Sequence, residues 1–378
     1  MLRSAERIPG GGLWVSNCPF CLTLSRTLIF KSQIGKRLIR VFHAMAGAEH
    51  GGAEAFFCRL VPALADAGLK QETAIRPYER RLKILEHANI PTHKLTFGGR
   101  FDFRTRGRLK SCIETFAPNI LVAWMNRAAR FCPTGNHTIV GRLGGYYDLK
   151  YYSTCNHLIG NTQNICDYII GAGWPMENCH YLPNFVDGTP GIPIDRSIFN
   201  TPNDTPLLLA MGRLHENKAF DILLNAVALA PGCHLWIAGD GALRQSLSKQ
   251  SKQLGIEERV RFLGWRQDTA NLLATCDIFL CPSRHEPLGN VVIEAWAQRK
   301  PVIAAAAQGP TSLITPYLNG LLFPIDNAKA ASDAILQVIA SEDLRTTLAY
   351  NGFNAYQKHF TKARVVALYH EFFETVRS

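Results

Sequence analysis

The stretch LLLAMGRLHENKAFDILLNAVALAPGCHLWIAGDG, residues 207–241, contains one complete unit of the pattern that decides the fold. It begins with a short apolar run at 207–211, continues with helical spacing of apolar residues at 220–230, and returns to an apolar run at 234–238. A strand, a helix and a second strand in this order predict a parallel βαβ unit. Outward from this unit the alternation continues on both sides, which predicts parallel sheets with helices on both faces.

The same alternation fills most of the remaining chain. Before the quoted stretch, strands are predicted at 38–44, 72–75, 92–95, 120–124, 137–143 and 158–161, and helices at 53–67, 80–88 and 105–116. After it, strands are predicted at 260–263, 278–281 and 301–304, and helices at 242–254, 268–274, 290–298 and 362–376. Residues 181–183 are expected to close the first series.

The chain has 378 residues, which suits two domains rather than one. We expect a poorly ordered leader at 1–37, a first Rossmann-like domain at 38–187 and a proline-rich linker at 188–206. A second Rossmann-like domain is expected at 207–355, followed at 356–378 by a C-terminal helix that packs back on the first domain. Two doubly wound sheets of this kind place a ligand cleft between the carboxyl ends of their strands.

Charge is distributed unevenly between the two halves. Residues 1–199 contain 24 Lys and Arg against 14 Asp and Glu, whereas residues 200–378 contain 17 against 16. A basic first half indicates either an anionic partner, such as a phosphorylated lipid, a membrane surface or nucleic acid, or simply a solvated surface. No apolar run reaches the ~18–20 residues of a membrane-spanning helix.

The 11 cysteines are an odd number and, apart from Cys18 and Cys21, are scattered singly. This spacing predicts reduced thiols and a cytoplasmic location. Cys18 and Cys21 form an isolated pair without a second pair, which does not favour a metal or redox site.

Two glycine turns follow predicted strands of the second domain. Gly212-Arg213 ends the strand at 207–211, and Lys218 precedes the next helix. A strand-end glycine allows a close approach of backbone to a ligand, and the two cations could neutralise a diphosphate. Gly239-Asp240-Gly241 resembles the start of a dinucleotide-binding turn but lacks its third glycine. Each motif is also compatible with an ordinary surface turn.

The most informative stretch is CPSRHEPLGNVVIEA at residues 281–295. It places Glu286 in a loop after a strand and Glu294 in the following helix, with Leu288, Gly289 and Asn290 presenting backbone amides at the helix start. A carboxylate at Glu294, on an otherwise apolar helix face, requires hydroxyl or cationic partners. A ribose diol is a suitable partner, and a solvated surface glutamate is the alternative.

Taken in order, these motifs resemble glycosyltransferase family 4, which has the GT-B fold. The set is Gly51–Glu54, Gly212-Arg213 with Lys218, Gly239–Gly241, Phe262–Gly264, Pro282-Ser283 with Glu286 and Glu294, and Asn319-Gly320. The resemblance covers about residues 38–375. The motifs Trp124–Arg127, Arg142–Tyr147 and Leu182–Phe185 are similar to bacterial members that build lipopolysaccharide core or cell-surface polysaccharide.

The resemblance implies an α/β, GT-B enzyme of the hexosyl-transfer class that retains the anomeric configuration. It implies that Arg213 and Lys218 bind the donor diphosphate and that Glu286 approaches the donor sugar, these three being the catalytic candidates. Donor-binding candidates are Gly51, Gly52, Gly212, Leu263, Trp265, Leu288, Gly289, Asn290 and Glu294. No cofactor and no metal are expected, since the two cations can take the place of Mg²⁺ and the chain has no Asp-x-Asp motif.

The chain departs from the family at one position. Many relatives have a histidine after the strand that corresponds to 138–141, where this chain has Arg142; His137 precedes the strand and is expected to be structural. We therefore name no catalytic histidine. Asn126, Arg127, Arg142 and Asp148 are the acceptor-side candidates.

The expected partners are a nucleotide-sugar donor and a glycan or lipid-linked acceptor, with no nucleic acid. The expected location is the cytoplasm, with peripheral attachment of the first domain to the anionic inner face of the plasma membrane. Alternatives are a GT-B nucleotide-sugar epimerase or sugar phosphorylase, and a non-enzymatic protein that binds anionic surfaces.

Overall fold

The computed structural model describes residues 38–49, 51–99 and 102–377. The leader expected at 1–37, which includes Cys18 and Cys21, lies outside these residues. The described residues from Ile39 onward belong to one compact unit that contains two separate β-sheets. Within the described ranges, no helix is both long and apolar enough to cross a membrane.

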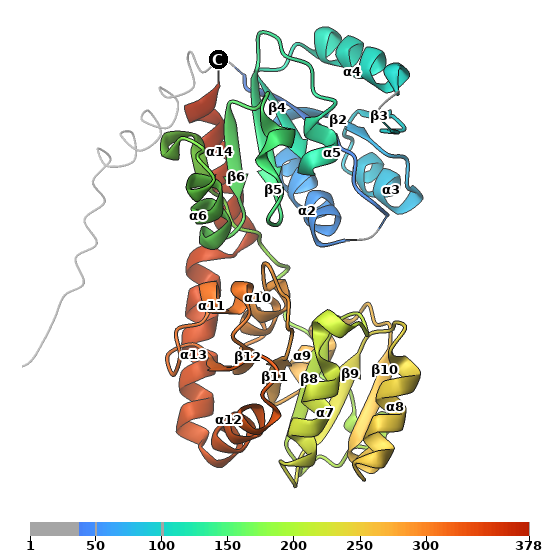
Figure 1. Ribbon diagram of the computed structural model, residues 1–378, viewed down its shortest axis with the longest axis vertical. Coiled ribbons are helices and arrows are strands. Elements are labelled where there is room, and N and C mark those ends of the chain that lie inside the picture. Colours follow the sequence, from blue (N-terminus) through green and yellow to red (C-terminus); the bar gives the residue numbers. More distant parts are fainter. Residues whose placement is uncertain (1–37, 50, 100–101, 378) are drawn as a thin grey trace, which may run out of the picture. The chain divides into compact units, whose positions relative to one another are not determined.

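The first sheet consists, among the described residues, of seven parallel strands in the order β3-β2-β1-β4-β5-β6-β7 (Figure 1). Their bounds are β1 Arg40–Met45, β2 Lys70–Ile75, β3 Thr92–Lys94, β4 Ile120–Trp124, β5 Thr138–Leu143, β6 His157–Gly160 and β7 Cys179–Tyr181. The helices between them are α2 Gly52–Asp66, α3 Glu79–His87, α4 Phe103–Phe116, α5 Met125–Ala129 and α6 Gln163–Gly171. The order reverses between β1 and β4, the position at which such sheets place ligands.

Strand β4 shows why this sheet is buried on both faces. All five of its residues are buried, and alternate residues belong to different apolar clusters. Ile120 and Val122 join the cluster on one face, and Leu121 and Ala123 join the cluster on the other. Because successive side chains of a strand point to opposite faces, a continuous apolar run is the pattern of a central parallel strand.

The second sheet has, within the described chain, six parallel strands in the order β10-β9-β8-β11-β12-β13. Their bounds are β8 Leu207–Met211, β9 His234–Ala238, β10 Val260–Gly264, β11 Ile278–Cys281, β12 Val302–Ala305 and β13 Leu321–Phe323. The helices are α7 Phe220–Ala228, α8 Arg244–Gln253, α9 Thr269–Thr275, α10 Asn290–Ala297, α11 Gln308–Leu313 and α12 Ala328–Ala340. The two-sheet α/β architecture predicted from the sequence is confirmed.

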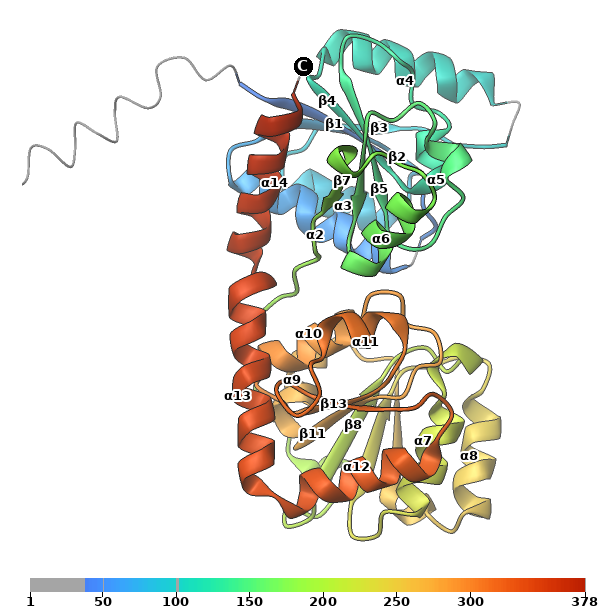
Figure 2. The ribbon, with the colours of Figure 1, turned by 60° about the vertical axis from the view of Figure 1, so that its left-hand side comes forward.

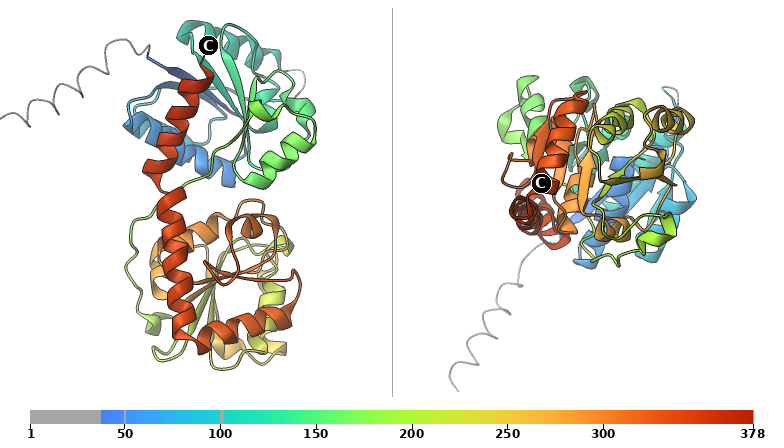
Figure 3. Two further views of the ribbon diagram at one scale, coloured as in Figure 1. Left: turned by 90° about the vertical axis from the view of Figure 1, so that its left-hand side faces the viewer. Right: turned by 90° about the horizontal axis from the view of Figure 1, so that it is seen from below.

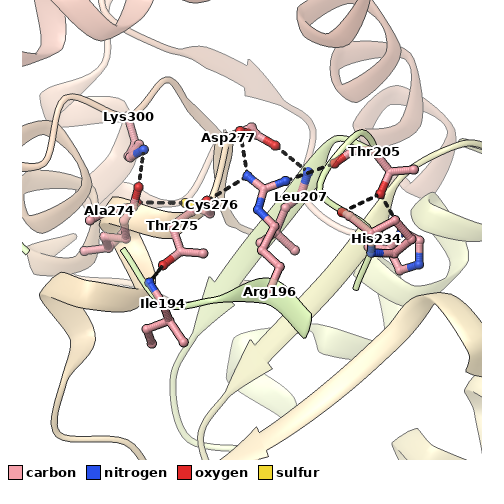
Figure 4. A network of polar contacts seen from close by, with 12 residues as sticks. Ile194, Arg196, Thr205, Leu207, His234, Ala274, Thr275, Cys276, Asp277 and Lys300 are labelled. Carbon is pink, nitrogen blue, oxygen red and sulfur yellow. Dashed lines mark hydrogen bonds and ion pairs between the residues drawn. The ribbon is translucent and has the colours of Figure 1, made fainter. Parts of the chain in front are cut away.

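The segment that connects the two sheets, predicted as a linker at 188–206 and called the crossover here, is fixed at the amino edge of the second sheet (Figure 4). The Arg196 guanidinium donates to the Thr205 and Thr275 carbonyl oxygens at 3.1 and 2.8 Å and to Asp277 Oδ1 at 3.0 Å. Asp277 Oδ2 accepts from the Leu207 amide at 2.7 Å, so one ion pair joins the crossover to the starts of β8 and β11. The crossover is therefore structured rather than a free linker.

The chain ends in two consecutive helices, α13 Glu342–His359 and α14 Lys362–Val376 (Figure 2). Helix α13 packs against α10, whereas α14 packs against α2 (Figure 3). Tyr369 and Phe373 of α14 belong to an apolar cluster of the first sheet. Thr138 at the start of β5 donates to the Val376 carbonyl oxygen at 2.8 Å. The domain boundary drawn from the sequence between 355 and 356 falls inside α13, which continues through Gly352 to His359.

Candidate functional site

The predicted donor residues lie at the carboxyl edge of the second sheet. Gly212 and Arg213 directly follow β8, and Lys218 ends the short 3₁₀ helix Glu216–Lys218. Glu286 lies in the loop between β11 and α10. Because all strands of this sheet are parallel, these loops leave it at the same edge.

The side chains of Lys218 and Glu286 form an ion pair. The other Glu286 oxygen, Oε1, accepts from the Gly289 amide at 3.3 Å, and the two side chains are only 25% and 13% exposed. Although burial lowers the pKa of Lys218, the Glu286 carboxylate raises it, and the net effect is above the ordinary value. Lys218 is therefore a firmly protonated cation, held beside the start of α10.

Arg284 orders the loop that carries Glu286. Its guanidinium donates to both carboxylate oxygens of Asp221, at 3.0 and 2.6 Å, and to Asp326 at 2.5 Å. It also donates to the Glu216 carbonyl oxygen at 2.7 Å, next to Lys218. A bidentate arginine fixes direction as well as distance, so Arg284 sets the loops of Lys218 and Glu286 relative to each other.

Two glycines bring α11 against this loop. Gly289, which precedes α10, has a φ of 78°, a left-handed conformation that favours glycine. The Gly309 amide donates to the Glu286 carbonyl oxygen at 2.7 Å, and a Cβ at Gly309 would lie 2.5 Å from that oxygen. The backbone around Glu286 therefore needs glycine at both positions.

Glu294 lies on the second turn of α10, and its nearest cation is Arg59 of α2. Arg59 Nη1 and Glu294 Oε1 are 3.9 Å apart, with 29% and 27% of their side chains exposed. Burial raises the pKa of Glu294, while Arg59 counteracts this and Glu286 adds to it. The carboxylate is thus held between a cation from the first domain and an anion from its own domain.

The other donor-side candidates are divided between the carboxyl edges of the two sheets. Arg213 is exposed and forms no hydrogen bond or ion pair with any described residue. Leu263, the penultimate residue of β10, is half-buried, and Trp265, just after this strand, is 71% exposed. Gly51 and Gly52 begin α2, at the carboxyl edge of the first sheet, where a Cβ at Gly51 would lie 2.2 Å from Glu54 Oε2.

Three acceptor-side candidates remain accessible, and one does not. Asn126 and Arg127 lie in α5, directly after β4, with Arg127 exposed. Asp148 is exposed and pairs with Lys150 at 2.5 Å. Arg142 is only 1% exposed, inside β5, so the expectation that its side chain faces an acceptor does not agree with its burial.

His137, expected to be structural, is half-buried. Its Nε2 lies 3.1 Å from the Pro133 carbonyl oxygen, and burial lowers its pKa. Among the described residues, no group of three or more His, Cys, Asp or Glu side chains is arranged to hold a metal ion.

Sequence reasoning did not name Arg59, and it included Asn184 only within the motif Leu182–Phe185, without a role. Asn184 follows β7 and is 1% exposed; its Nδ2 donates to Asn290 Oδ1 at 3.3 Å, at the start of α10. Arg59 lies among Phe56, Phe57 and Leu60 on an apolar part of α2. A lone arginine in such a run requires an anionic or polar partner, and this pattern could have identified Arg59 from the sequence.

A separate cavity of about 470 Å³ lies at the amino edge of the second sheet, lined by residues that include Arg196, Asp277, Lys300 and Arg345. The cations of this cavity already form hydrogen bonds within the fold. Lys300 donates to the Ala274 carbonyl oxygen at 2.9 Å, and Arg345 donates to the Val338 carbonyl oxygen at 3.0 Å. The predicted donor residues do not line this cavity, and their cluster at the carboxyl edge is the better candidate site.

Comparisons with known proteins relate the chain to glycosyltransferases. The family described as "Glycosyl transferases group 1" matches residues 192–355. The lipopolysaccharide core biosynthesis glycosyltransferase LpsE of Rhizobium meliloti is 35% identical over 342 residues, which cover 88% of this chain and 98% of LpsE. LpsD of the same organism, also described as a lipopolysaccharide core biosynthesis glycosyltransferase, is 32% identical over 89% of this chain and 98% of its own.

Solved structures show the same fold. The Anabaena protein Alr3699/HepE in complex with UDP superposes with a TM-score of 0.79 at 22% identity, over 89% of this chain and all of that one. The lipopolysaccharide outer core galactosyltransferase WaaB, in its apo form, gives 0.70 at 18% identity, over 88% of this chain and 98% of WaaB.

Proposed function

Because this chain belongs to the group 1 glycosyl transferases and is a glycosyltransferase with a GT-B fold, we propose that it transfers a sugar from a nucleotide-sugar donor during synthesis of lipopolysaccharide core. The acceptor would be a glycan or a lipid-linked glycan, and the anomeric configuration would be retained. The observation that carries the proposal is the Lys218–Glu286 ion pair beside the start of α10, with Glu294 one turn further along that helix.

Each donor group has a counterpart at this edge. The diphosphate would lie against Arg213, whose guanidinium has no described partner, and against Lys218. The ribose hydroxyls would donate to Glu294, and the base would lie near Leu263 and Trp265. HepE binds UDP and UDP-glucose in its solved complexes, which supports a nucleoside diphosphate as the leaving group.

Glu286 would contact the donor sugar rather than attack it. Lys218 engages one of its oxygens and the Gly289 amide the other, so the orientation of the carboxylate is fixed while each oxygen keeps a free lone pair. A carboxylate held in this way can accept a sugar hydroxyl and orient the ring. The two cations would stabilise the charge that develops on the leaving diphosphate.

We propose that this charge stabilisation needs no metal. Two fixed positive charges can balance a departing diphosphate, provided that both are protonated, and Glu286 raises the pKa of Lys218. Transfer measured in excess EDTA should equal transfer measured with added Mg²⁺. A rate that falls by tenfold or more in EDTA and returns with Mg²⁺ would contradict this part of the proposal.

The first domain would attach to an anionic membrane through α4. Arg104, Arg106, Arg108 and Lys110 are all exposed on this helix, and Phe103 at its start is 70% exposed. Basic residues beside an exposed aromatic ring favour the interface of a bilayer with anionic lipids. Vesicles containing phosphatidylglycerol should bind the protein at low salt, and Arg104→Glu with Arg108→Glu should abolish this; equal binding to neutral vesicles would contradict it.

Thermal stabilisation against a panel of nucleotide sugars and nucleoside diphosphates tests the donor site. A ligand present at about 100 times its dissociation constant adds roughly 2.7 kcal/mol to folding stability, which is a readable shift. Arg213→Ala and Glu294→Ala should lose the shift, whereas Lys249→Ala, an exposed cation on α8, should keep it. No shift with any nucleotide would reject the donor site, and release of free epimerised sugar would favour an epimerase.

A further inference from the structure

Arg142 occupies an unusual position for a charged residue. Its guanidinium lies between two aromatic rings, 4.6 Å from the centroid of Phe56 and 4.7 Å from that of Trp124. Its Nε donates to the Tyr369 hydroxyl of α14 at 2.8 Å, and its Nη2 donates to Asn184 Oδ1 at 2.5 Å. The described contacts include no carboxylate, so the cation is held by aromatic faces and neutral oxygens alone.

Asn184 bonds both to Arg142 and to a residue of the second domain. Its Oδ1 accepts from Arg142, while its Nδ2 donates to Asn290 Oδ1 at 3.3 Å. Arg142 and Asn184 are each 1% exposed, and Asn290 is half-buried. An amide with both ends engaged has a fixed orientation, so Asn184 connects a rigid arginine to the first residue of α10.

The start of α10 is where a displacement would matter most. Its first residue is Asn290; the preceding amide, that of Gly289, holds Glu286, and Glu294 lies one turn further along the helix. A rotation of this helix start would therefore move the partner of Glu286 and the Glu294 carboxylate together.

We propose that Arg142 and Asn184 are positioning residues of the transferase, which fix the start of α10 through Asn290 and thereby align the donor site. This inference rests on the proposed function, because it assigns Glu286 and Glu294 to the donor. Neither residue would touch the substrate. Arg142 would act through Asn184, and Asn184 would act through Asn290.

Tyr369 provides a matched control for the test. It is 1% exposed and bonds to the same guanidinium, but on the side that leads to α14 rather than to α10. Tyr369→Phe should lower the melting temperature and leave UDP affinity at its wild-type value. Asn184→Ala should also lower the melting temperature, but in addition it should weaken UDP binding about fivefold, the effect of losing one hydrogen bond.

UDP titration by calorimetry on the full chain, below the melting temperature of each variant, measures the difference. In an Asn290→Ala background, Asn184→Ala should cause no further loss of UDP affinity, because the contact through which it acts is already absent. Should Asn184→Ala not fold, Asn184→Ser, which keeps a hydroxyl beside Arg142 but is too short to reach Asn290, tests the same expectation.

The outcomes separate this inference from the proposed function. If the wild-type protein binds UDP and folded Asn184 variants bind it equally well, the inference is overturned and the donor site stands. A fivefold loss that persists unchanged in the Asn290→Ala background also overturns it, because Asn184 would then act by another route. If the wild-type protein binds none of the nucleoside diphosphates, the proposed function itself fails.

Discussion

Replacing Arg59 with Met removes the positive charge that faces Glu294 from α2. Two unit charges 3.9 Å apart attract by about 4 kcal/mol at an effective dielectric constant of 20. Exposed ion pairs retain only about 0.2–1 kcal/mol of this after the costs of ordering and desolvation. Roughly three quarters of both side chains are buried, so we expect this ion pair to contribute about 1–2 kcal/mol. An interaction of this size changes the equilibrium that depends on it, here donor binding, by about 5- to 30-fold.

The variant should show a pH-dependent defect in donor binding. Burial already raises the pKa of Glu294, and Arg59 opposes that effect, so its removal raises the pKa further. The ionised form would then be lost at a higher pH on acidification. Asp187, which also faces Arg59, is itself an anion and does not replace the missing cation.

The assay is kcat/KM for the nucleotide sugar, measured across pH for wild type, Arg59→Met and Arg59→Lys. The acid limb of the Arg59→Met profile should move to higher pH, with activity recovering as pH rises, whereas Arg59→Lys should follow wild type closely. If Arg59→Met lowers kcat/KM by one constant factor at every pH, Arg59 does not act through the charge of Glu294, and the reasoning is refuted.

Three further changes probe the site and its support. Gly289→Ala should cost about 1–2 kcal/mol in stability, seen as a lower melting temperature, and should reduce kcat, because the position has a φ of 78° and its Cβ would lie 3.0 Å from Leu313; unchanged stability would contradict this. Phe373→Ala, in the core under α14, should cost about 3–5 kcal/mol and expose α14 to protease first; resistance equal to wild type would show that α14 is not held there. Burial, with the neighbouring His157, lowers the pKa of His180 to about 4, so the unfolded chain binds its proton first and stability should fall as pH drops from about 6.5 towards 4. His180→Gln should flatten that part of the stability curve, and an unchanged slope would assign it to other groups.

The elements that the sequence predicted well are those with a strong local pattern. The apolar runs of β4, β8, β9 and β11 match the strands of the structure residue for residue. Central parallel strands are buried on both faces, so the whole run is apolar and its ends are distinct. Helix α14 also has the bounds predicted from its spacing, 362–376.

Elements without such a pattern were not predicted. Helix α13 has many polar residues and no strong apolar face, so spacing alone gave no signal for it. The short helix α5 directly follows β4 and begins at Met125, whose φ of 64° is rare outside glycine. Such a sharp turn depends on the packed surroundings and leaves no mark in the sequence.

The predicted donor residues come together because the motifs follow strands, and parallel strands bring their carboxyl ends to one edge. The residues that contact this site could not be predicted in the same way. Asn184 and Arg59 meet α10 from more than 100 and 200 residues away along the chain, and only the folded chain reveals such contacts. Arg142 illustrates the converse, because its place in the family pattern made it an acceptor-side candidate while the rings of Phe56 and Trp124 enclose it.

Sugar transfer to a truncated lipopolysaccharide core, with the donor chosen from the nucleotide-sugar panel, tests the central claim most directly. The product should gain one sugar residue by mass, its new linkage should have the anomeric configuration of the donor by NMR, and Glu294→Ala should abolish its formation. A wild-type protein that binds the donor yet releases only free or epimerised sugar, or a product of inverted configuration, would contradict the account.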